Sequence, residues 1–378
     1  MDFGFTLEQQ SLIDRVHGLV KERIAPRAHA YDASGEAPLE DLQDLHREGW
    51  LLANLDKRRG GLGFGLHGDD PLSFFLIDEY LAYGNPSTAH CFQVHNNALM
   101  MIDAMASDAQ VADWITPTVE RGALIPGAGA EPYGAPPTTA QRVPGGYRVS
   151  GIKHYATNAS LAEWLWIGRV ASDSHPKPIM FMIHKDTPGL RIDSSAWRPT
   201  GMRACVSPWL HLENCFVPAE NLLGKPGQFL GENWMGKINF AFTANYLGAA
   251  RAMYDWALHY VRERGGKDSY RQLRFGELKS LLDAARLMLY NAVRMFKSNP
   301  DGALVAAHGA KWLAKETLDK MMWSTAELCG STALFVNHPL ERFYRDMHLH
   351  MMHGRHDIAA QIAGAAELGE PYDVNRTH

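Results

Sequence analysis

The 378-residue chain has few cysteines, no long apolar run and no excess of one charge. Its four cysteines, Cys91, Cys205, Cys215 and Cys329, form no C-x-x-C pair, which excludes a zinc ribbon and a thioredoxin motif and predicts free thiols. No apolar run reaches the roughly 18–20 residues that a membrane span needs. The 37 basic and 42 acidic residues are mixed along the chain, which disfavours nucleic-acid binding.

The first residues also lack the apolar core of a signal peptide, so we expect a cytoplasmic protein. The composition is that of an ordinary globular protein, with 46% hydrophobic and 21% charged residues. At roughly 100–200 residues per domain, the length predicts two or three domains with a sizeable core.

Helical periodicity fills the first third of the chain. Thr6 and Gln9 form a capping box before apolar residues that follow a 3.6-residue period up to Ile24, and Pro26 is expected to end this helix. Further helices are expected over residues 39–48, 71–82 and 89–106. The sequence thus predicts an all-helical domain over residues 1–122.

Short apolar runs bounded by glycine and proline replace the helical pattern over residues 123–230. The runs at 146–151, 163–171, 178–184 and 209–217 have the length of strands, and no helical segment separates them. A doubly wound dinucleotide-binding fold is therefore not supported, and we predict a β domain. Over residues 231–378, long helical segments at 235–264, 274–298, 303–330 and 339–368 predict a four-helix bundle.

Four short segments, in this order, resemble motifs of the acyl-CoA dehydrogenase superfamily of flavoproteins. They are Glu131-Pro132, residues 151–158 (GIKHYATN), residues 200–207 (TGMRACVS) and residues 339–346 (PLERFYRD). The resemblance implies an α+β multidomain fold with an N-terminal helical domain, a central β-barrel domain and a C-terminal four-helix bundle. It also implies a flavin between the β domain and the bundle.

The resemblance further implies which residues contact the flavin. A flavin ring needs an aromatic wall and hydrogen bonds, and Tyr155 and Thr157 offer both. The other residues implied are Glu131, Asn158, Arg203, Ser207, Gly330 and Ser331. Alternatively, Tyr155 and Thr157 merely favour a strand, and Arg203 forms a buried ion pair. The family segment that helps to hold the adenine half of FAD is altered here at residues 327–333, so FAD and FMN both stay open.

The glutamate that removes the substrate α-proton in the family's dehydrogenases has no counterpart here. One family position for it corresponds to Gly354, and the other lies near Ile238 and Asn239. No acidic residue occurs over 238–250 or 347–356, and Asp357 is the nearest acid. Because α-proton abstraction needs a tuned carboxylate, dehydrogenation would require a displaced base such as Asp357.

Histidines occupy this region instead. Residues 345–354 (RDMHLHMMHG) resemble the R-D-x-R-T-H-T-L-H-D pattern of the two-component flavin monooxygenases on this fold, of which dibenzothiophene monooxygenase is one. The resemblance makes His350 and His353 candidate catalytic residues, with His95 as the histidine on an early helix. A histidine can donate a proton to a flavin C4a-hydroperoxide and take it back. Zinc binding by His350, His353 and His356 is disfavoured, because their spacing spreads them over about 120° of a helix.

Three functions therefore stay open. The first, which the histidines favour, is a monooxygenase that uses O2 and reduced flavin from a separate reductase. The second is an acyl-CoA or acyl-carrier thioester dehydrogenase with a displaced base, and the third is a scaffold or binding protein without activity. Apolar positions on several helix faces, for example Leu281, Leu282 and Leu289, also predict a homo-oligomer, either a tetramer or a dimer.

Overall fold

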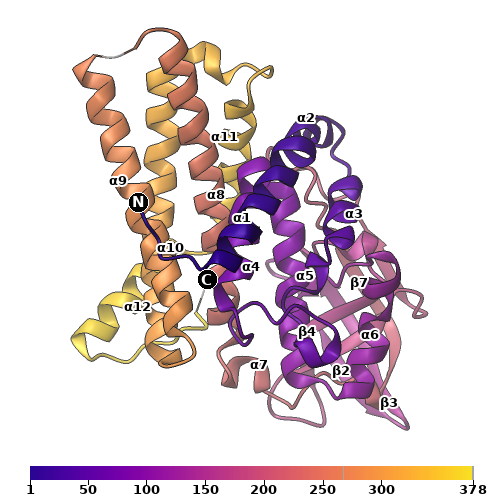
Figure 1. Ribbon diagram of the computed structural model, residues 1–378. Helices are drawn as coiled ribbons and strands as arrows, with labels where there is room; N and C mark the ends of the chain where they lie inside the picture. Colours follow the sequence, from indigo (N-terminus) through magenta and orange to yellow (C-terminus); the bar gives the residue numbers. More distant parts are fainter. Residues whose placement is uncertain (267, 377–378) are drawn as a thin grey trace.

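The computed structural model describes residues 1–266 and 268–376, and its three regions follow one another along the chain (Figure 1). Helices come first, a sheet follows, and a bundle of long helices stands beside both. The predicted order of helical domain, β domain and helical bundle is confirmed, whereas the predicted domain limits stay a prediction. No helix within the described ranges is long and apolar enough to cross a membrane.

The N-terminal region begins with α1 (Leu7–Leu19), which starts at the predicted capping box of Thr6 and Gln9. The other α-helices of this region are α2 (Ala25–Ser34), α3 (Leu39–Arg47), α4 (Pro71–Gly84), α5 (Pro86–Met105) and α6 (Asp108–Arg121). The sequence prediction omitted α6, although Ser107 and Gln110 form a second capping box in front of it.

The prediction that Pro26 ends the first helix was wrong. A π-helical turn at Val20–Ile24 joins α1 directly to α2, and Pro26 lies in the first turn of α2. Proline is tolerated in a first turn because its missing N–H would have no partner there. The π turn shifts the hydrogen-bond register, which an apolar period of 3.6 residues does not reveal.

The central region forms an open mixed sheet. Its strands are β1 (Gly127–Ala128), β2 (Thr139–Val143), β3 (Gly146–Lys153), β4 (Trp164–Ser172), β5 (Ile179–His184), β6 (Leu190–Asp193) and β7 (Trp209–Pro218). The order is β1-β4-β2-β3-β7-β6, β5 pairs with β4, and β1 and β2 run parallel to β4. Among the described strands, β6 pairs only with β7, so the expected barrel is corrected to a sheet that does not close.

The C-terminal region packs α8 (Trp234–Glu263), α9 (Ser269–Met295), α10 (Pro300–Cys329) and α11 (Pro339–His350) side by side (Figure 1). The short helix α7 (Gln228–Gly231) precedes them and α12 (His356–Leu368) follows. Every residue of α8 from 239 to 250 is buried, as expected of a central helix. The helix predicted over 339–368 is in fact two helices, because Gly354 has an extended backbone with φ −161° and ψ 160°.

A buried carboxylate, Glu79 on α4, joins the N-terminal helices to the bundle. It accepts hydrogen bonds from Arg251 of α8 (3.1 Å) and from the hydroxyl of Tyr290 on α9, and it forms an ion pair with Arg286 of α9 (2.9 Å). At the same crossing, a Cβ atom on Gly248 of α8 would lie 2.0 Å from the Glu79 carbonyl oxygen. Only glycine therefore allows the two helices to approach this closely.

We expect Glu79→Gln to lower the free energy of unfolding by about 3–5 kcal/mol, because it leaves two buried guanidinium groups without their counter-charge. Urea unfolding followed by circular dichroism measures the change. The matched control is Glu263→Gln, whose carboxylate pairs with His259 at the surface (3.1 Å), and it should change stability by less than about 0.5 kcal/mol. Equal losses in the two variants would contradict the role given to Glu79.

Candidate active site

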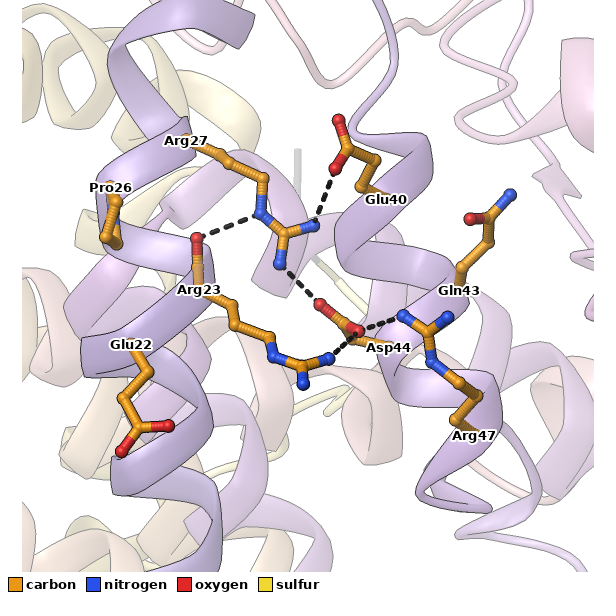
Figure 2. Close-up of a pocket in the computed structure, with 8 residues that line it drawn as sticks. All are labelled: Glu22, Arg23, Pro26, Arg27, Glu40, Gln43, Asp44 and Arg47. Carbon is orange, nitrogen blue, oxygen red and sulfur yellow. Dashed lines mark hydrogen bonds and ion pairs between the residues drawn. The ribbon is translucent and has the colours of Figure 1, made fainter.

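A surface pocket of about 430 Å³ opens between α2 and α3. Figure 2 shows Arg23, Arg27 and Arg47 pointing toward Asp44. The distance from Arg23 Nη1 to Asp44 Oδ1 is 2.8 Å, and the other two arginines pair with the same carboxylate. Burial of Asp44 opposes its ionisation, but hydrogen bonds from the three guanidinium groups outweigh this and hold its pKa below the ordinary value. Because these charges satisfy one another, we assign the pocket a structural role.

Three histidines meet where α5, α8 and the α11–α12 junction come together. The ring centroids of His90 on α5 and His350 at the end of α11 are 4.9 Å apart, edge to face. His353 lies 6.0 Å from His90 and stacks on Phe242 of α8 at 4.6 Å. Phe242 is also 5.6 Å from the rings of His90 and His350. We call His90, His350 and His353 the histidine cluster.

His350 is the buried member whose environment is most clearly unusual. It is 4% exposed, and its Nε2 atom has no hydrogen-bond partner within residues 1–266 and 268–376. Burial lowers its pKa well below the ordinary value, and the nearby His90, His353 and Lys311 lower it further. The ring is therefore neutral at pH 7, with one donor and one acceptor nitrogen. Such a group can give or take a proton at a site from which water is largely excluded.

His353 lies at the open side of the cluster and faces the β domain. Its side chain is exposed, and its ring centroid is 6.4 Å from that of Tyr155, which follows β3. Tyr155 is 52% exposed and has a φ of 53°. A left-handed backbone is uncommon for tyrosine and is typical of functional sites. The two rings thus present aromatic surface where the β domain meets the bundle.

Three predicted cofactor residues lie next to the cluster and tie the β domain to α5. The hydroxyl oxygen of Thr157 is 2.7 Å from that of Ser207 and 3.4 Å from Nε2 of His90. Asn158 donates from Nδ2 to the carbonyl oxygen of Cys91 at 2.8 Å. These contacts hold the first turns of α5, and with them His90, against the β domain.

Two other predicted cofactor residues have partners elsewhere. Glu131 pairs with the buried amine of Lys153, and it accepts a hydrogen bond from the N–H of Thr138 at 3.3 Å. Its carboxylate is therefore engaged inside the β domain. Arg203 is half-buried and donates to the carbonyl oxygen of Ala33 at 3.4 Å, so the buried ion pair considered for it does not form among the described residues.

Gly330 and Ser331 are exposed where α10 ends, before α11 begins. His350 closes α11 at its opposite end, and a helix of 12 residues is about 18 Å long. The structure therefore does not bring Gly330 or Ser331 together with the histidine cluster of the same chain.

His95, the predicted catalytic residue of the early helix, does not join the cluster. It is fully buried, its Nε2 lies 2.8 Å from the carbonyl oxygen of Leu51, and its Nδ1 accepts the N–H of Ile125 at 2.9 Å. His90 and His95 are five residues apart, about 140° around α5, so only one of them can face the cluster. His90 takes this place, and no signal in the sequence distinguished it from His95.

We expect His95→Phe to lower the free energy of unfolding by about 1–3 kcal/mol, because it leaves two buried backbone groups unpaired. Burial lowers the pKa of His95 to about 4, below its unfolded value, so stability should fall as the pH drops from about 6.5 toward 4. Urea unfolding at several pH values should show a shallower fall in the variant. An unchanged slope, or a larger loss in the matched variant His90→Phe, would contradict the structural role of His95.

The acids closest in sequence to the cluster are engaged elsewhere. Asp346 accepts the N–H of Met202 at 2.5 Å and lies 3.5 Å from Arg342. Asp357 is exposed, and its hydrogen bond from Arg355 lowers its pKa to about 2. A carboxylate this acidic is a weak base. Asp357 therefore does not fit the role of a displaced catalytic base.

The helical domain, the sheet and the helical bundle thus meet at an aromatic, histidine-lined site. Domain models of the acyl-CoA dehydrogenases match residues 6–121 (N-terminal domain), 126–215 (middle domain) and 240–358 (C-terminal domain). Together they cover most of the chain in the family's order. The chain belongs to the acyl-CoA dehydrogenase superfamily.

The chain is similar in sequence to thioester dehydrogenases and in fold to both a dehydrogenase and a monooxygenase. Benzylmalonyl-CoA dehydrogenase of Aromatoleum aromaticum is 27% identical, over 97% of this chain and 100% of the relative. The structure of butyryl-CoA dehydrogenase from Megasphaera elsdenii has a TM-score of 0.88 at 23% identity, covering 97% of this chain and 100% of that one. Dibenzothiophene monooxygenase from Paenibacillus sp. A11-2, with a TM-score of 0.85 at 21% identity, covers the same shares. At such identities the structural similarity shows the fold alone.

Proposed function

We propose that this protein is a flavin-dependent monooxygenase that uses reduced flavin and O2. The observation that carries the proposal is the histidine cluster, which lies at the α11–α12 junction, where the family's α-proton abstraction would need a carboxylate. The neutral His350 and the engaged Asp357 together argue against such a base. A separate reductase is the proposed source of reduced flavin.

The residues at the site fit a flavin. The half-exposed Tyr155 would pack against the flavin ring. The hydroxyls of Thr157 and Ser207 lie nearby and are buried. Buried atoms without a partner, Asn158 Oδ1 among them, leave hydrogen-bonding capacity nearby. Bound reduced flavin would supply the electrons that activate O2. Glu131, Arg203, Gly330 and Ser331 stay candidates only for contacts with more distant parts of the cofactor, which is either FMN or FAD.

Each histidine of the cluster has a distinct task in this proposal. His353, at the exposed rim beside Tyr155, holds a proton toward the reacting oxygen. His350, deeper in the site, exchanges a proton through its unpartnered Nε2. His90 links the hydroxyl of Thr157 to the ring of His350. The aromatic side chains of Phe242 and Tyr246 pack against His350 and shield this histidine from water.

A thioester dehydrogenase is the second candidate, and the names of the relatives favour it. Benzylmalonyl-CoA dehydrogenase and a probable acyl-CoA dehydrogenase of Bacillus subtilis (28% identical, over 92% of this chain and 94% of the relative) both act, by their names, on CoA thioesters. This function would require one of the cluster histidines to remove the α-proton.

We expect the purified protein to bind FMN or FAD at micromolar concentration or tighter. When chemically reduced flavin is supplied as the source of two electrons, one oxygen atom of labelled O2 should enter an aromatic probe such as indole and the other should leave as water. His353→Gln should lower this oxygen transfer by about 10²–10⁴ in rate. The matched control is His348→Gln, because His348 is exposed and its Nδ1 lies 2.8 Å from the carbonyl oxygen of Tyr344 in its own helix. Mass spectrometry of the product measures the label.

Two outcomes would contradict the monooxygenase. Anaerobic bleaching of the bound oxidised flavin by butyryl-CoA would establish the dehydrogenase, and loss of this bleaching in His353→Gln would name its base. If the wild type and His353→Gln form only hydrogen peroxide, at equal rates, the histidine cluster has no role in oxygen transfer. If the protein binds neither FMN nor FAD, oxidised or reduced, the scaffold or binding protein without activity becomes the remaining function.

We also propose that the chain forms a homo-oligomer, either a tetramer or a dimer. The outer face of α9 and α10 exposes Met288 (38%), Trp312 (41%) and Trp323 (68%). The terminal carbon of Met288 approaches Gly309 on α10, so this face is shared by both helices. Exposed apolar surface of this kind is typical of subunit interfaces.

Light scattering should therefore give two or four times the 42.1 kDa of one chain. Trp323→Glu should shift the distribution toward smaller species, because it places a charge in the interface, whereas Leu7→Glu on the exposed start of α1 should not. A single species of one chain's mass at micromolar concentration would contradict the proposal.

A further inference from the structure

Lys311 on α10 is a buried amine without a carboxylate partner. Its side chain is 5% exposed, its Nζ donates to Asn239 Oδ1 at 2.7 Å, and it forms no ion pair with the described residues. An ammonium group has three donors, of which this hydrogen bond uses one. An uncompensated charge inside a protein is costly, and this one lies beside the histidine cluster with two of its donors unused, so it is a candidate for a functional site.

One further donor lies beside Lys311, and no acidic residue of the described ranges forms an ion pair with this lysine. Asn239 is 3% exposed, and in the part of the chain that the structure describes its Nδ2 has no hydrogen-bond partner. His308 on the same helix and His356 of α12 already use Nε2 on the carbonyl oxygens of Val374 (3.0 Å) and Met351 (2.9 Å), so Asn239 is the neighbour with a donor to offer. Burial lowers the pKa of Lys311 to about 8, which leaves the amine protonated at neutral pH.

Phe242 connects Lys311 to the histidine cluster. The Lys311 Nζ atom lies 5.7 Å from the centroid of the Phe242 ring, and the His350 ring lies 5.6 Å from it. Asn239 precedes Phe242 by one turn of α8. Polar groups therefore follow one another around this ring, from the exposed His353 to the buried Lys311.

We propose that Lys311 and Asn239 form the subsite that binds the carboxylate of the substrate. The ligand class is an aromatic organic acid, because the carboxylate would meet the ammonium and amide donors while its ring would pack against the Phe242 ring, 5.7 Å from the Lys311 Nζ atom. The inference rests on the proposed function only in placing the reacting end of the molecule at His353. A hydrogen-bonded charge pair in such a buried place supplies both affinity and orientation.

Calorimetric titration with benzoate and its neutral isostere benzamide, with and without added FMN, tests the subsite. Wild-type protein should bind benzoate about 10–100-fold more tightly than benzamide, as expected for hydrogen bonds to a charged group. Lys311→Met should abolish this preference. The matched control is Lys237→Met, which removes another buried lysine, one that lies 4.2 Å over the Trp234 ring and away from the cluster, and it should retain the preference.

Asn239→Asp keeps the shape of the site but places a carboxylate against Lys311, so it too should abolish the preference for benzoate. Benzoate that binds no better than benzamide to the wild type, or a preference that survives in Lys311→Met and Asn239→Asp, would overturn the proposal. Binding is measured here without turnover. A negative oxygen-transfer assay would therefore not affect the benzoate-binding result. Likewise, a titration without preference for benzoate would not contradict the monooxygenase proposal.

Discussion

The close contact between α4 and α8 at Gly248 determines where α4, α5 and His90 lie relative to α8. Because Gly248 has no side chain, the Glu79 backbone rests directly on α8, and the Glu79 carboxylate is held there by Arg251 and Arg286. Helix α5 follows α4 after the single residue Asn85, so the position of α4 determines that of α5. A bulkier residue at position 248 would move α5, and with it His90, away from Phe242.

Some buried charges of this protein have ion-pair partners, whereas the buried charge of Lys311 has none among the described residues. Glu79 is buried together with two guanidinium groups, and Lys153 is buried against Glu131. Such pairs avoid the cost of an isolated internal charge and join elements together. Lys311 is equally buried, but among the described residues it has no carboxylate partner and donates one hydrogen bond, to the amide oxygen of Asn239. Packing alone gives no reason to keep an ammonium group there, whereas binding an anion does.

Sequence periodicity and local motifs predicted the order of the regions well, because each rests on short-range physics. Capping boxes, apolar periods and strand-length runs depend on neighbouring residues only. What they did not predict depends on distant contacts or on small changes of register. The choice between His90 and His95 depends on which side of α5 faces α8, and the open edge of the sheet depends on the pairing of β6. The break at Gly354 moved His356 onto a separate helix, which no count of residues along one helix reveals.

The absence of a catalytic glutamate and the presence of the lone lysine are physically connected. Asn239 lies at one of the two places where the family resemblance locates the base, and its side-chain oxygen accepts a hydrogen bond from Lys311. A glutamate at this position would form an ion pair with that ammonium group. The ion pair would lower the pKa of the carboxyl and weaken it as a base. An amide at position 239 instead leaves the positive charge available to a ligand. The same two side chains therefore disfavour α-proton abstraction by a carboxylate, and they fit the proposed substrate, which would bring its own negative charge to the proposed subsite.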